Sequence, residues 1–378
     1  MNYLNIPSPA FVIDEKLLRK NLQLINHVQN EAGIEILLAF KGFAMWSVFP
    51  IIRRYLKGAA ASSLYEARLC LEEMKTLAHV YSPAYMEEEF SSLTDYSSHI
   101  VFNSFDQFNK FYPSTLKADH HISCGIRVNP EFSDVSTDLY NPAAPGSRLG
   151  VGSNEFPEQL PEGVEGIHFH VLCESDSYSL EMVLQNLENK FGRFLRGLKW
   201  VNMGGGHLIT RKGYAFGHLI NLLRQFKLKY NVHVILEPGS AIAWNAGVLV
   251  STIQDVVIHS GIKTAILDVS FTAHMPDTLE MPYRPAIIGA TDPHPESKFL
   301  YRLGGISCLA GDFLEEYDFG RKLKPGDKII FKDMAHYTMV KTTMFNGVKH
   351  PSIAIITEKG SLKIIREFNY EDYKNRLS

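Results

Sequence analysis

The chain is poor in cysteine, carries little net charge and has no long apolar run, and each of these absences excludes a class of protein. Only four of its 378 residues are cysteines and none forms a CxxC pair, so we expect neither a disulfide framework nor a cysteine-based zinc site. A formal net charge of −3 without a Lys/Arg-rich run argues against a nucleic-acid partner. No run approaches the roughly 18 apolar residues that a membrane-spanning helix needs.

Metal binding and export are not indicated either. His120-His121 is the densest histidine pair, and because no metal-ligand spacing surrounds it we expect no metal site. Residues 1–11 lack the basic start and apolar centre of a secretory signal peptide. What is present, 45% hydrophobic and 21% charged residues, is typical of a soluble enzyme. The expected location is the cytoplasm, where the thiols stay reduced.

Between about residues 35 and 240, short β-rich runs alternate with helix-like stretches. Helix signals include a capping-box spacing that begins at Ser63 and the apolar spacing of Tyr178–Leu187. Eight alternating units are typical of a closed parallel barrel, so we predict an α/β fold with a (β/α)8 TIM-type barrel. The expected strands are Ile36–Phe40, Ala59–Ser63, His79–Ser82, Ile100–Asn103, Ile122–Val128, Gly166–Phe169, Trp200–Met203 and Val232–Leu236.

After about residue 243 the pattern changes to strand-like runs joined by Gly/Pro turns, which predicts a C-terminal β-rich domain of the sandwich or barrel-like kind. The runs are Val248–Val257, Thr264–Val269, Lys328–Phe331, Ser352–Thr357 and Leu362–Arg366. The N-terminal run Ala10–Ile13 fits either unit as a joining strand. We predict a barrel over 12–243 and a β-rich domain over 1–11 and 244–378. The irregular stretch 129–163 has no predicted structure.

Four of the expected barrel strands end on residues with related chemistry. Lys41 follows the first, His170 the sixth, Gly204–Gly206 the seventh and Glu237 the eighth. The C-terminal ends of parallel barrel strands converge on one rim, where barrel active sites are built. We therefore predict that these residues share one site.

Two of these features suit pyridoxal-phosphate chemistry and also have plainer explanations. A lysine at an apolar strand end is partly desolvated, which lowers its pKa toward a nucleophilic amine, although a rim lysine in solvent is the plainer alternative. Bare glycines let backbone N–H groups approach a phosphate, and the helix expected over Phe216–Tyr230 would add its dipole. A glycine triplet can equally be only a tight turn.

The carboxylate and the histidines can likewise be interpreted either as cofactor-binding residues or as ordinary structural ones. A carboxylate such as Glu237 would keep a pyridine nitrogen protonated and so strengthen an electron sink. Glu-Pro-Gly is, however, also a common turn. His168 and His170 alternate with Phe169 and so point to one face of their strand, where either would stack on a flat ring or lie hydrogen-bonded in the core.

With the motifs around them, these residues resemble the alanine-racemase-fold pyridoxal-phosphate decarboxylases, a group that includes ornithine, diaminopimelate and carboxynorspermidine decarboxylases. The resemblance spans roughly residues 8 to 350. Its motifs are Ala39-Phe40-Lys41, Arg127-Val128-Asn129-Pro130, Ser147-Arg148-Leu149-Gly150, His168-Phe169-His170-Val171, Asn202-Met203-Gly204-Gly205-Gly206, Glu237-Pro238-Gly239, Cys308-Leu309-Ala310-Gly311-Asp312, and Tyr337 with Phe345-Asn346-Gly347. It implies pyridoxal 5'-phosphate as the cofactor.

The resemblance also implies roles for the residues that bind the cofactor. Lys41 would hold it covalently, His170 would stack on its ring and Glu237 would pair with the ring nitrogen. The glycine triplet Gly204–Gly206 with Tyr337 would hold the phosphate.

Further roles follow from the same resemblance. Cys308 would reach across a dimer interface to protonate the carbanion after carbon dioxide leaves, and Asp312 would accompany it from the same partner subunit. The resemblance therefore implies a homodimer with shared active sites. Glu66 matches a family acid near the cofactor.

Departures from the group's common pattern narrow the resemblance. Leu309 stands where ornithine and diaminopimelate decarboxylases have an acid, Ser240 where they usually have Arg, and Val171–Ser175 where they have Val/Ile-Gly-Ser. The residues at these positions, together with Asp268 and Phe271–Pro276, resemble those of carboxynorspermidine decarboxylases. The resemblance then implies decarboxylation of carboxynorspermidine or carboxyspermidine to norspermidine or spermidine.

Such a substrate is a polycation, whose ammonium groups need paired charge when they are desolvated. We expect Asp268 to bind its tail, with Asp312 and His274 as further substrate-binding residues. Arg284 would either meet a carboxylate or only support its loop.

Three alternatives remain. One is decarboxylation of another basic amino acid, namely diaminopimelate, ornithine or lysine. Another is a same-fold amino-acid racemase, although such racemases usually place Arg rather than a residue like Glu237 against the pyridine nitrogen. The third is a non-catalytic cofactor-binding protein, which tends to lose the residues that correspond to Lys41 or Cys308.

Overall fold

The computed structural model describes residues 3–135, 140–280 and 283–378. It divides into two compact units, Lys20–Ile242, here called the barrel unit, and Met1–Arg19 with Ala243–Ser378, here called the sheet unit. Within the described residues, no helix is both long and apolar enough to cross a membrane.

The barrel unit is built on a parallel sheet that nearly closes on itself. Its strands are β2 (Glu35–Ile36), β3 (Leu38–Ala39), β4 (Ala59–Ala61), β5 (Ala78–Tyr81), β6 (Ser97–Phe102), β7 (Ser123–Arg127), β8 (Val164–His168), β9 (Trp200–Asn202) and β10 (His233–Leu236). They pair in the order β2-β10-β9-β8-β7-β6-β5-β4-β3. Only Leu37 separates β2 from β3, so the two ends of this order are consecutive pieces of one run. Counted as one strand, they give the predicted eight-stranded parallel barrel, which is confirmed.

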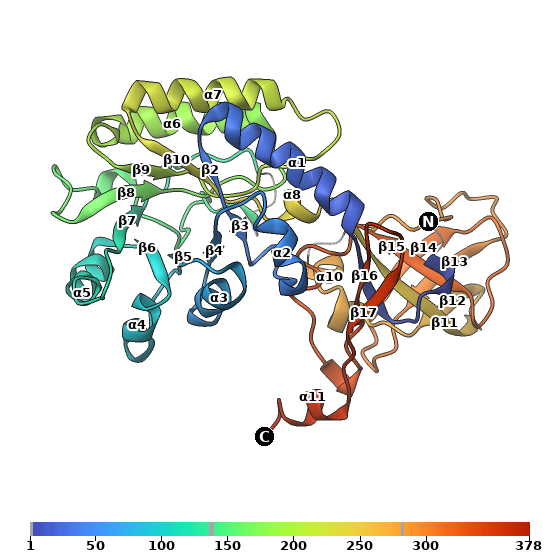
Figure 1. Cartoon of the computed structure of the whole chain (residues 1–378). Coiled ribbons are helices and arrows are strands. Elements are labelled where there is room, and N and C mark those ends of the chain that lie inside the picture. Colours follow the sequence, from blue (N-terminus) through green and yellow to red (C-terminus); the bar gives the residue numbers. More distant parts are fainter. Residues whose placement is uncertain (1–2, 136–139, 281–282) are drawn as a thin grey trace. The chain divides into compact units, whose positions relative to one another are not determined.

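Helices connect these strands and pack around the outside of the sheet (Figure 1). They are α1 (Glu15–Ala32), α2 (Phe49–Ile52), α3 (Leu64–Leu69), α4 (Glu87–Thr94), α5 (Phe105–Thr115), α6 (Ser177–Leu195), α7 (Phe216–Tyr230) and α8 (Ser240–Ala243). The predicted cap of α3 is present, since the Ser63 hydroxyl accepts the Glu66 N–H at 3.2 Å. The helix then continues as a π-helix over Cys70–Met74. Short 3-10 helices cover Tyr3–Asn5, Trp46–Val48, Ser153–Glu155 and Phe345–Gly347.

The interior of the barrel is filled near β9 by Trp200. A Cβ atom on Gly166 would lie 2.1 Å from the Trp200 ring, and one on Gly125 would lie 2.3 Å from it. The indole N–H donates to the Ser123 hydroxyl at 2.7 Å. Two neighbouring strands therefore need glycine so that the largest side chain can lie flat between them.

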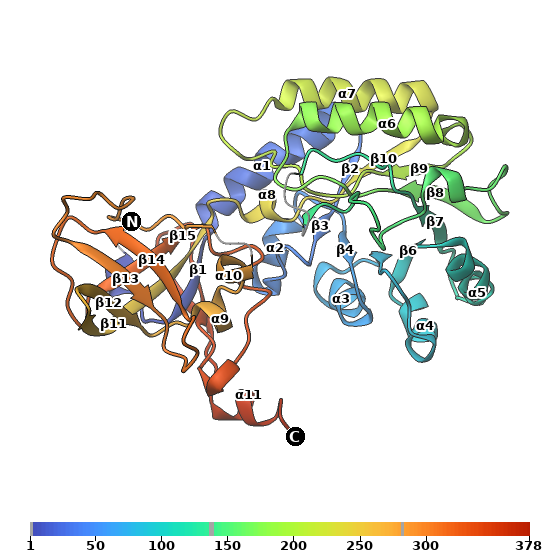
Figure 2. The ribbon, with the colours of Figure 1, turned by 180° about the vertical axis from the view of Figure 1, so that it is seen from behind.

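The sheet unit contains a mostly antiparallel sheet (Figure 2). Its strands are β1 (Ala10–Asp14), β11 (Gly247–His259), β12 (Ile262–Leu267), β13 (Leu300–Gly304), β14 (Phe313–Asp318), β15 (Lys328–Lys332), β16 (Ser352–Ile356) and β17 (Leu362–Arg366). Their order is β14-β13-β12-β11-β1-β16-β17, and β15 pairs with β11. Short helices are α9 (Phe271–His274), α10 (Asp277–Glu280) and α11 (Tyr370–Lys374).

The N-terminal strand belongs to the sheet unit. All five residues of β1 are buried, and β1 lies between β11, to which it is antiparallel, and β16, to which it is parallel. The five C-terminal strands predicted from the sequence are present, and β13 and β14 are additional. Charged residues such as Arg302, Glu315 and Glu316 interrupt the apolar pattern of these two strands and conceal them in the sequence.

The described residues of the stretch 129–163 are irregular, as the composition indicates. A single parallel bridge joins Val128 to Val151, and the 3-10 helix over Ser153–Glu155 follows. Residues 136–139 of this stretch lie outside the described residues.

Candidate active site

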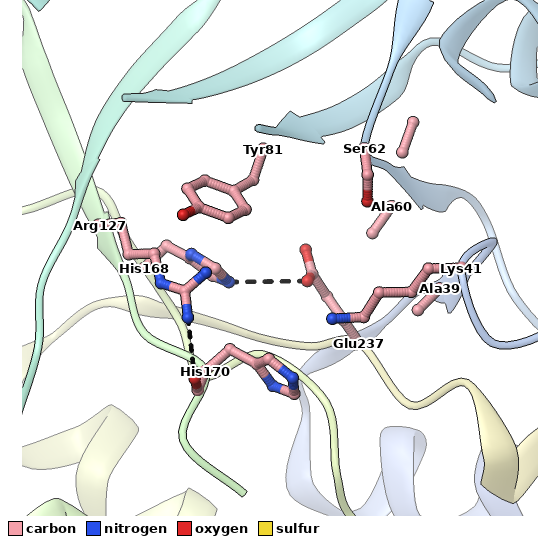
Figure 3. A pocket seen from close by; sticks show the side chains of 10 residues that line it. Ala39, Lys41, Ala60, Ser62, Tyr81, Arg127, His168, His170 and Glu237 are labelled. Carbon is pink, nitrogen blue, oxygen red and sulfur yellow. Dashed lines mark hydrogen bonds and ion pairs between the residues drawn. The ribbon is translucent and has the colours of Figure 1, made fainter. Parts of the chain in front are cut away.

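One pocket of the barrel unit is lined by residues at or just beyond the C-terminal ends of the strands. It encloses about 350 Å³, part of which is open to solvent. Figure 3 shows the side chains of Lys41, His170 and Glu237 converging on this space. The lining residues are Ala39, Lys41, Ala60, Ala61, Ser62, Tyr81, Arg127, His168, His170 and Glu237. Three of the predicted strand-end residues therefore meet in one site, as a barrel rim favours.

Lys41 lies in the turn directly after β3. The N–H groups of Gly42 and Phe43 both donate to the Ala39 carbonyl, at 3.0 and 3.2 Å, so the chain turns sharply at the strand end. Lys41 keeps an exposed surface toward the pocket, yet the walls around it hold its amine in a poorly solvated place. This desolvation, and next the positive charge of Arg127, lower the pKa of Lys41. A larger fraction of uncharged, nucleophilic amine follows.

Two glycines bring Lys41 and Glu237 together. The turn at Gly42 crosses the turn at Gly239, and a Cβ atom on Gly42 would lie 2.8 Å from the Gly239 Cα. Ala39 N–H also donates to the Pro238 carbonyl at 3.3 Å. Only bare backbone permits so close a crossing. The glycine after Lys41 is a signal of the site that the sequence analysis did not use.

Glu237 is held as a carboxylate. The Asn202 amide donates to its Oε1 at 2.6 Å, and the His168 Nε2 lies 3.7 Å from its Oε2. Burial would raise the pKa of Glu237, but the interactions with His168 and Asn202 and the charge of Lys41 outweigh burial and hold it below its ordinary value. A fixed negative charge therefore faces the pocket.

His170 is fixed in orientation by the glycine triplet. The Gly205 N–H donates to its Nδ1 at 3.0 Å, and the Gly205 carbonyl oxygen lies 3.2 Å from the same atom, so two contacts with Gly205 orient the ring. Burial, then the charges of Lys41 and Arg127, keep the pKa of His170 well below its ordinary value. The ring is therefore neutral at pH 7, as a group that stacks on a flat cofactor can be.

The glycine triplet packs against the ends of neighbouring strands. Gly204 and Gly206 have φ of +66° and +91°, and a Cβ atom on Gly205 would lie 2.3 Å from the Glu237 carbonyl oxygen. These are conformations and contacts that only glycine accepts. The triplet thus places His170 as well as offering backbone to a phosphate.

The helix predicted to follow this triplet is present as α7 at Phe216–Tyr230, and the support of its dipole for a bound phosphate stays a prediction. Residues 207–215 separate Gly206 from α7, so the start of that helix is remote in the chain. Two of the triplet N–H groups are also used internally, that of Gly204 by Asn202 Oδ1 at 2.9 Å and that of Gly205 by His170. Of the three triplet N–H groups, that of Gly206 has no hydrogen-bond partner among the described residues, and it remains available to an anion.

Glu66 lies close enough to Lys41 for their charges to interact. Its Oε2 accepts the N–H of the pocket residue Ser62 at 2.6 Å. Burial raises the pKa of Glu66, and the Ser62 hydrogen bond and Lys41 oppose that shift. The family acid expected near the cofactor is therefore next to the site.

Tyr81 and Arg127 line the pocket and were not assigned to it from the sequence. The Arg127 guanidinium lies 4.5 Å from the centre of the Tyr81 ring and donates to the His170 carbonyl at 3.0 Å. Tyr81 donates to Asn103 Oδ1 at 2.8 Å. Both residues are the last of the observed strands β5 and β7, whereas the predicted strands His79–Ser82 and Ile122–Val128 each end one residue later, so the predicted ends did not single them out.

The other predicted site residues belong to the sheet unit. Cys308 is exposed, in the loop between β13 and β14. Tyr337 is partly buried with φ of 52°, an uncommon conformation for a large side chain.

The residues predicted to bind the substrate have partners within the sheet unit that favour structural roles. Asp268 accepts hydrogen bonds from Ser8 Oγ at 2.6 Å and from Ser251 Oγ at 2.7 Å. His274 is fully buried, and its Nδ1 accepts the Ser270 N–H at 3.2 Å. His274 is thus enclosed by protein, whereas Asp268 is partly exposed, and its role in substrate binding stays a prediction.

Asp312 and Arg284 are similarly engaged. The Asp312 side chain accepts from Thr272 N at 3.0 Å and from Ser307 Oγ at 2.5 Å, and the residue is 4% exposed. The Arg284 guanidinium donates to the Glu316 carbonyl at 2.5 Å and lies 4.1 Å from the Tyr317 ring centre. Loop support, one of the two roles predicted for Arg284, matches these contacts.

The barrel pocket has the chemistry that pyridoxal phosphate requires. It brings together an amine of lowered pKa, an ionised carboxylate and a neutral imidazole, beside one unpaired backbone N–H in a glycine-rich turn. No group of three or more His, Cys, Asp or Glu in the described residues is arranged to hold a metal ion.

Comparison with known proteins points to the same chemistry. A family model described as "Pyridoxal-dependent decarboxylase, C-terminal sheet domain" matches residues 10–335. The chain is 49% identical over 374 residues to carboxyaminopropylagmatine decarboxylase of Synechocystis sp., covering 99% of this chain and 96% of that protein. It is 44% identical over 386 residues to carboxynorspermidine/carboxyspermidine decarboxylase of Campylobacter jejuni, covering 100% of both.

A solved structure agrees over nearly the whole chain. The crystal structure of carboxynorspermidine decarboxylase complexed with norspermidine, from Campylobacter jejuni, superposes with a TM-score of 0.90 and 42% identity. The match covers 98% of this chain and 100% of that one.

Proposed function

The chain belongs to the pyridoxal-dependent decarboxylases, and from this premise we propose that it removes the α-carboxyl group of a carboxylated polyamine precursor. The observation that carries the proposal is the pocket in which Lys41, His170 and Glu237 meet, in a chain alignable end to end with decarboxylases of such precursors. Carboxynorspermidine and carboxyspermidine, with norspermidine and spermidine as products, are the first candidates.

Pyridoxal phosphate supplies an aldehyde and an electron-withdrawing pyridinium ring when it is bound. Lys41 would hold it covalently, because its lowered pKa leaves the amine uncharged and nucleophilic. Glu237, kept ionised by Asn202 and His168, would hold a proton on the ring nitrogen. The neutral His170 would cover one face of the ring, and the Gly206 N–H would contribute to phosphate binding.

The sheet unit would supply the acid. We propose that Cys308 returns a proton to the α-carbon once carbon dioxide has left, since its thiol is exposed in a short loop. Tyr337 would bind the phosphate. These roles come from the family motifs that the residues match.

A second substrate deserves a test because of one observation. The relative that is 49% identical is named for carboxyaminopropylagmatine, whose tail is a guanidinium rather than an ammonium group. The two tails differ in geometry, since a guanidinium forms two parallel hydrogen bonds with a carboxylate and an ammonium does not. The same head chemistry serves both substrates.

The test is carbon dioxide release from six compounds in parallel: carboxynorspermidine, carboxyspermidine, carboxyaminopropylagmatine, diaminopimelate, ornithine and lysine. We expect kcat/KM for one or more of the first three to exceed that for the last three by about 100-fold or more, because a site built for a longer polycation leaves buried polar groups unpaired with the shorter ones. Lys41→Ala is the control and should lose both activity and the absorbance of the cofactor–lysine imine.

Equal or faster turnover of diaminopimelate, ornithine or lysine would contradict the proposed substrate class. Racemisation without carbon dioxide release would contradict decarboxylation itself. The ratio of kcat/KM for the ammonium-tailed compounds to kcat/KM for the guanidinium-tailed compound shows which kind of tail the enzyme prefers.

We also propose a homodimer located in the cytoplasm. Ile306 and Leu309 of the Cys308 loop are exposed, as is Phe345 next to the Asn346 that bonds to Cys308, and exposed apolar side chains of this kind favour an interface. All four cysteines are unpaired, which suits a reducing compartment. Light scattering would measure the dimer, and mixing inactive Lys41→Ala and Cys308→Ala variants should restore part of the activity if the sites are shared.

A further inference from the structure

The loop that carries Cys308 is shaped from within by Asp312. The Asp312 carboxylate accepts the N–H and the hydroxyl of Ser307, at 3.1 and 2.5 Å, and the N–H of Thr272 at 3.0 Å. Its backbone closes the loop as well, because Gly305 N–H donates to the Asp312 carbonyl at 2.7 Å. These bonds hold the two ends of the loop, while Cys308 lies at its exposed tip.

A second support reaches the tip from another part of the chain. The Cys308 N–H donates to the Asn346 side-chain Oδ1 at 2.9 Å, across 38 residues of sequence. Asn346 is held at φ of 57° and is followed by Gly347 at φ of 71°, so two successive left-handed residues form this turn. Asparagine and glycine are the residues that tolerate that conformation best. The turn thus presents the amide group toward the Cys308 loop.

The C-terminal segment packs on the turn that contains Asn346. The Tyr373 ring lies against Gly347, where an added Cβ atom would be 3.5 Å from it. The Phe368 ring meets the His350 ring edge to face, with centroids 4.9 Å apart. Phe368 and Tyr373 are partly buried in a segment whose residues are mostly exposed. Their burial shows where the segment is anchored.

The segment is also ordered by its own contacts. The Asn369 side chain caps α11 by accepting a hydrogen bond from the Glu371 N–H at 2.8 Å, and the Asp372 carboxylate accepts one from the Asn369 N–H at 2.8 Å. Arg366 pairs with Asp372 at 2.7 Å. A short helix that is capped in this way can act as a rigid element rather than as a loose end.

We propose that residues 367–376 form a latch that positions the Cys308 thiol through Asn346. Tyr373 packs on the turn at Gly347 and Phe368 anchors the segment on His350; the turn orients the Asn346 amide, and the amide fixes the backbone of Cys308. Asn346 and Tyr373 are positioning residues in this scheme. The inference rests on the proposed function only for the role of the thiol as the acid.

The latch matters because proton return is sensitive to distance. A general acid must lie within hydrogen-bonding reach of the atom that it protonates, and a displacement of about 1 Å can reduce the rate by roughly 100-fold. Cys308 lies on an exposed loop, and such loops are mobile unless they are tied to a scaffold. The Asn346 bond at the tip supplies such a tie.

The main test compares Asn346→Gly, which keeps the left-handed turn but removes the acceptor, with Asn346→Asp, which keeps a side-chain oxygen. We expect Asn346→Gly to lower kcat by about 10-fold to 100-fold with little change in KM, and Asn346→Asp to recover most of the loss. The amine formed per carbon dioxide released should also fall below one in Asn346→Gly, because a proton taken up at the carbon of the cofactor's former aldehyde group, in place of the α-carbon, would after hydrolysis release the substrate as an aldehyde and leave its amino group on the cofactor. A role in stability alone would leave that ratio at one.

Two variants of α11, one with the predicted effect and one control, test the C-terminal part of the latch. Tyr373→Ala should behave like Asn346→Gly, whereas Tyr370→Ala, which removes an aromatic ring that is 67% exposed on the same short helix, should behave like wild type. In a Cys308→Ala background, neither Asn346→Gly nor Tyr373→Ala should lower kcat further, since residues that act through one group are not additive. Additive losses would overturn the proposal.

Hydrogen exchange of the peptide that contains Cys308 separates this inference from the proposed function, since it needs no substrate. Exchange at the Cys308 amide should accelerate in Asn346→Gly and Tyr373→Ala and not in Tyr370→Ala. Unchanged exchange in the first two variants would overturn the latch even if the enzyme is a decarboxylase. Faster exchange in a protein that decarboxylates none of the six compounds would support the latch while the proposed function fails.

Discussion

A stacked pair of histidines in the barrel predicts a specific dependence of stability on pH. His79 of β5 and His99 of β6 lie side by side with ring centroids 3.8 Å apart and an interplanar angle of 22°. His99 also packs edge to face on Trp200 at 5.4 Å. His79 is two residues before Tyr81 and so points to the same side of β5, into the barrel beneath the pocket. Two adjacent rings in the interior cannot both take a proton without cost.

Burial lowers the pKa of His99 to about 4, and neighbouring charges modify this shift. Those neighbours are Glu35, His233, Glu165 and His121. Burial, and next the charges of His99 and His233, hold the pKa of His79 well below its ordinary value. Both rings are therefore neutral in the folded chain at pH 7.

The magnitude follows from linkage between protonation and folding. An unfolded histidine titrates near 6.5, so below that pH the unfolded chain binds a proton that folded His99 does not accept until about pH 4. The stability contributed by neutral His99 is complete above pH 6.5 and is lost as the pH falls toward 4. Between pH 7.5 and pH 5 the loss for this one residue is about 2 kcal/mol.

The assay is urea unfolding of wild type and His99→Phe at several values between pH 7.5 and pH 5. Phenylalanine keeps a flat ring against His79 and Trp200 and loses the contact between Ser98 Oγ and the His99 Nδ1, 3.1 Å apart, at a pH-independent cost of about 1 kcal/mol. The wild type should therefore lose about 2 kcal/mol more than the variant as the pH falls. His294→Gln, which removes an exposed histidine, is the control and should follow wild type. Parallel pH profiles for wild type and His99→Phe would refute the reasoning.

Two further predictions concern the pocket and the packing of the barrel. Glu237→Gln should lower kcat by about 100-fold or more, because a fixed charge in a poorly solvated site is lost. Asn202→Ala, which removes the hydrogen bonds to Glu237 and from the Gly204 N–H but leaves the charge of Glu237, should lower kcat less. Measurements of kcat and of cofactor absorbance test both variants, and equal losses of kcat would contradict the role of the charge. Gly166→Ala should destabilise the chain by about 1–3 kcal/mol or more, since its Cβ atom would lie 2.1 Å from Trp200. Gly192→Ala, on α6 where nothing lies within 4 Å, should instead stabilise it by about 0.5–1 kcal/mol in the same urea assay.

Much of the barrel was predictable because its strands are short, apolar and bounded by turn residues. The eight expected runs correspond to the observed parallel strands, and α7 occupies the predicted Phe216–Tyr230. Hydrophobic periodicity and turn residues such as Gly and Pro act on the nearby chain, so a single sequence is enough to detect them. The strands β13 and β14 were not predicted, because charged residues lie along them and obscure the apolar pattern. Pairing with neighbouring strands, and not a local pattern, makes these segments strands.

The chemistry of the pocket was predictable to the same extent. Lys41, His170 and Glu237 follow apolar runs, and parallel strands of a barrel all end at one rim. The family motifs added Cys308 and Tyr337, which no local pattern identifies. The helix expected after the glycine triplet is present as α7, and whether its dipole acts on a bound phosphate stays a prediction.

The sequence by itself determined which residue types end the strands, and hence that an amine, an imidazole, a glycine turn and a carboxylate belong to one face. Only the tertiary structure decided their states and partners. The crossing of Gly42 over Gly239, the orientation of the His170 ring set by Gly205, and the Asn346 bond to Cys308 each join residues remote in sequence. Such pairings depend on how the chain closes in space, and burial, which shifts the pKa of Lys41, exists only after it has closed.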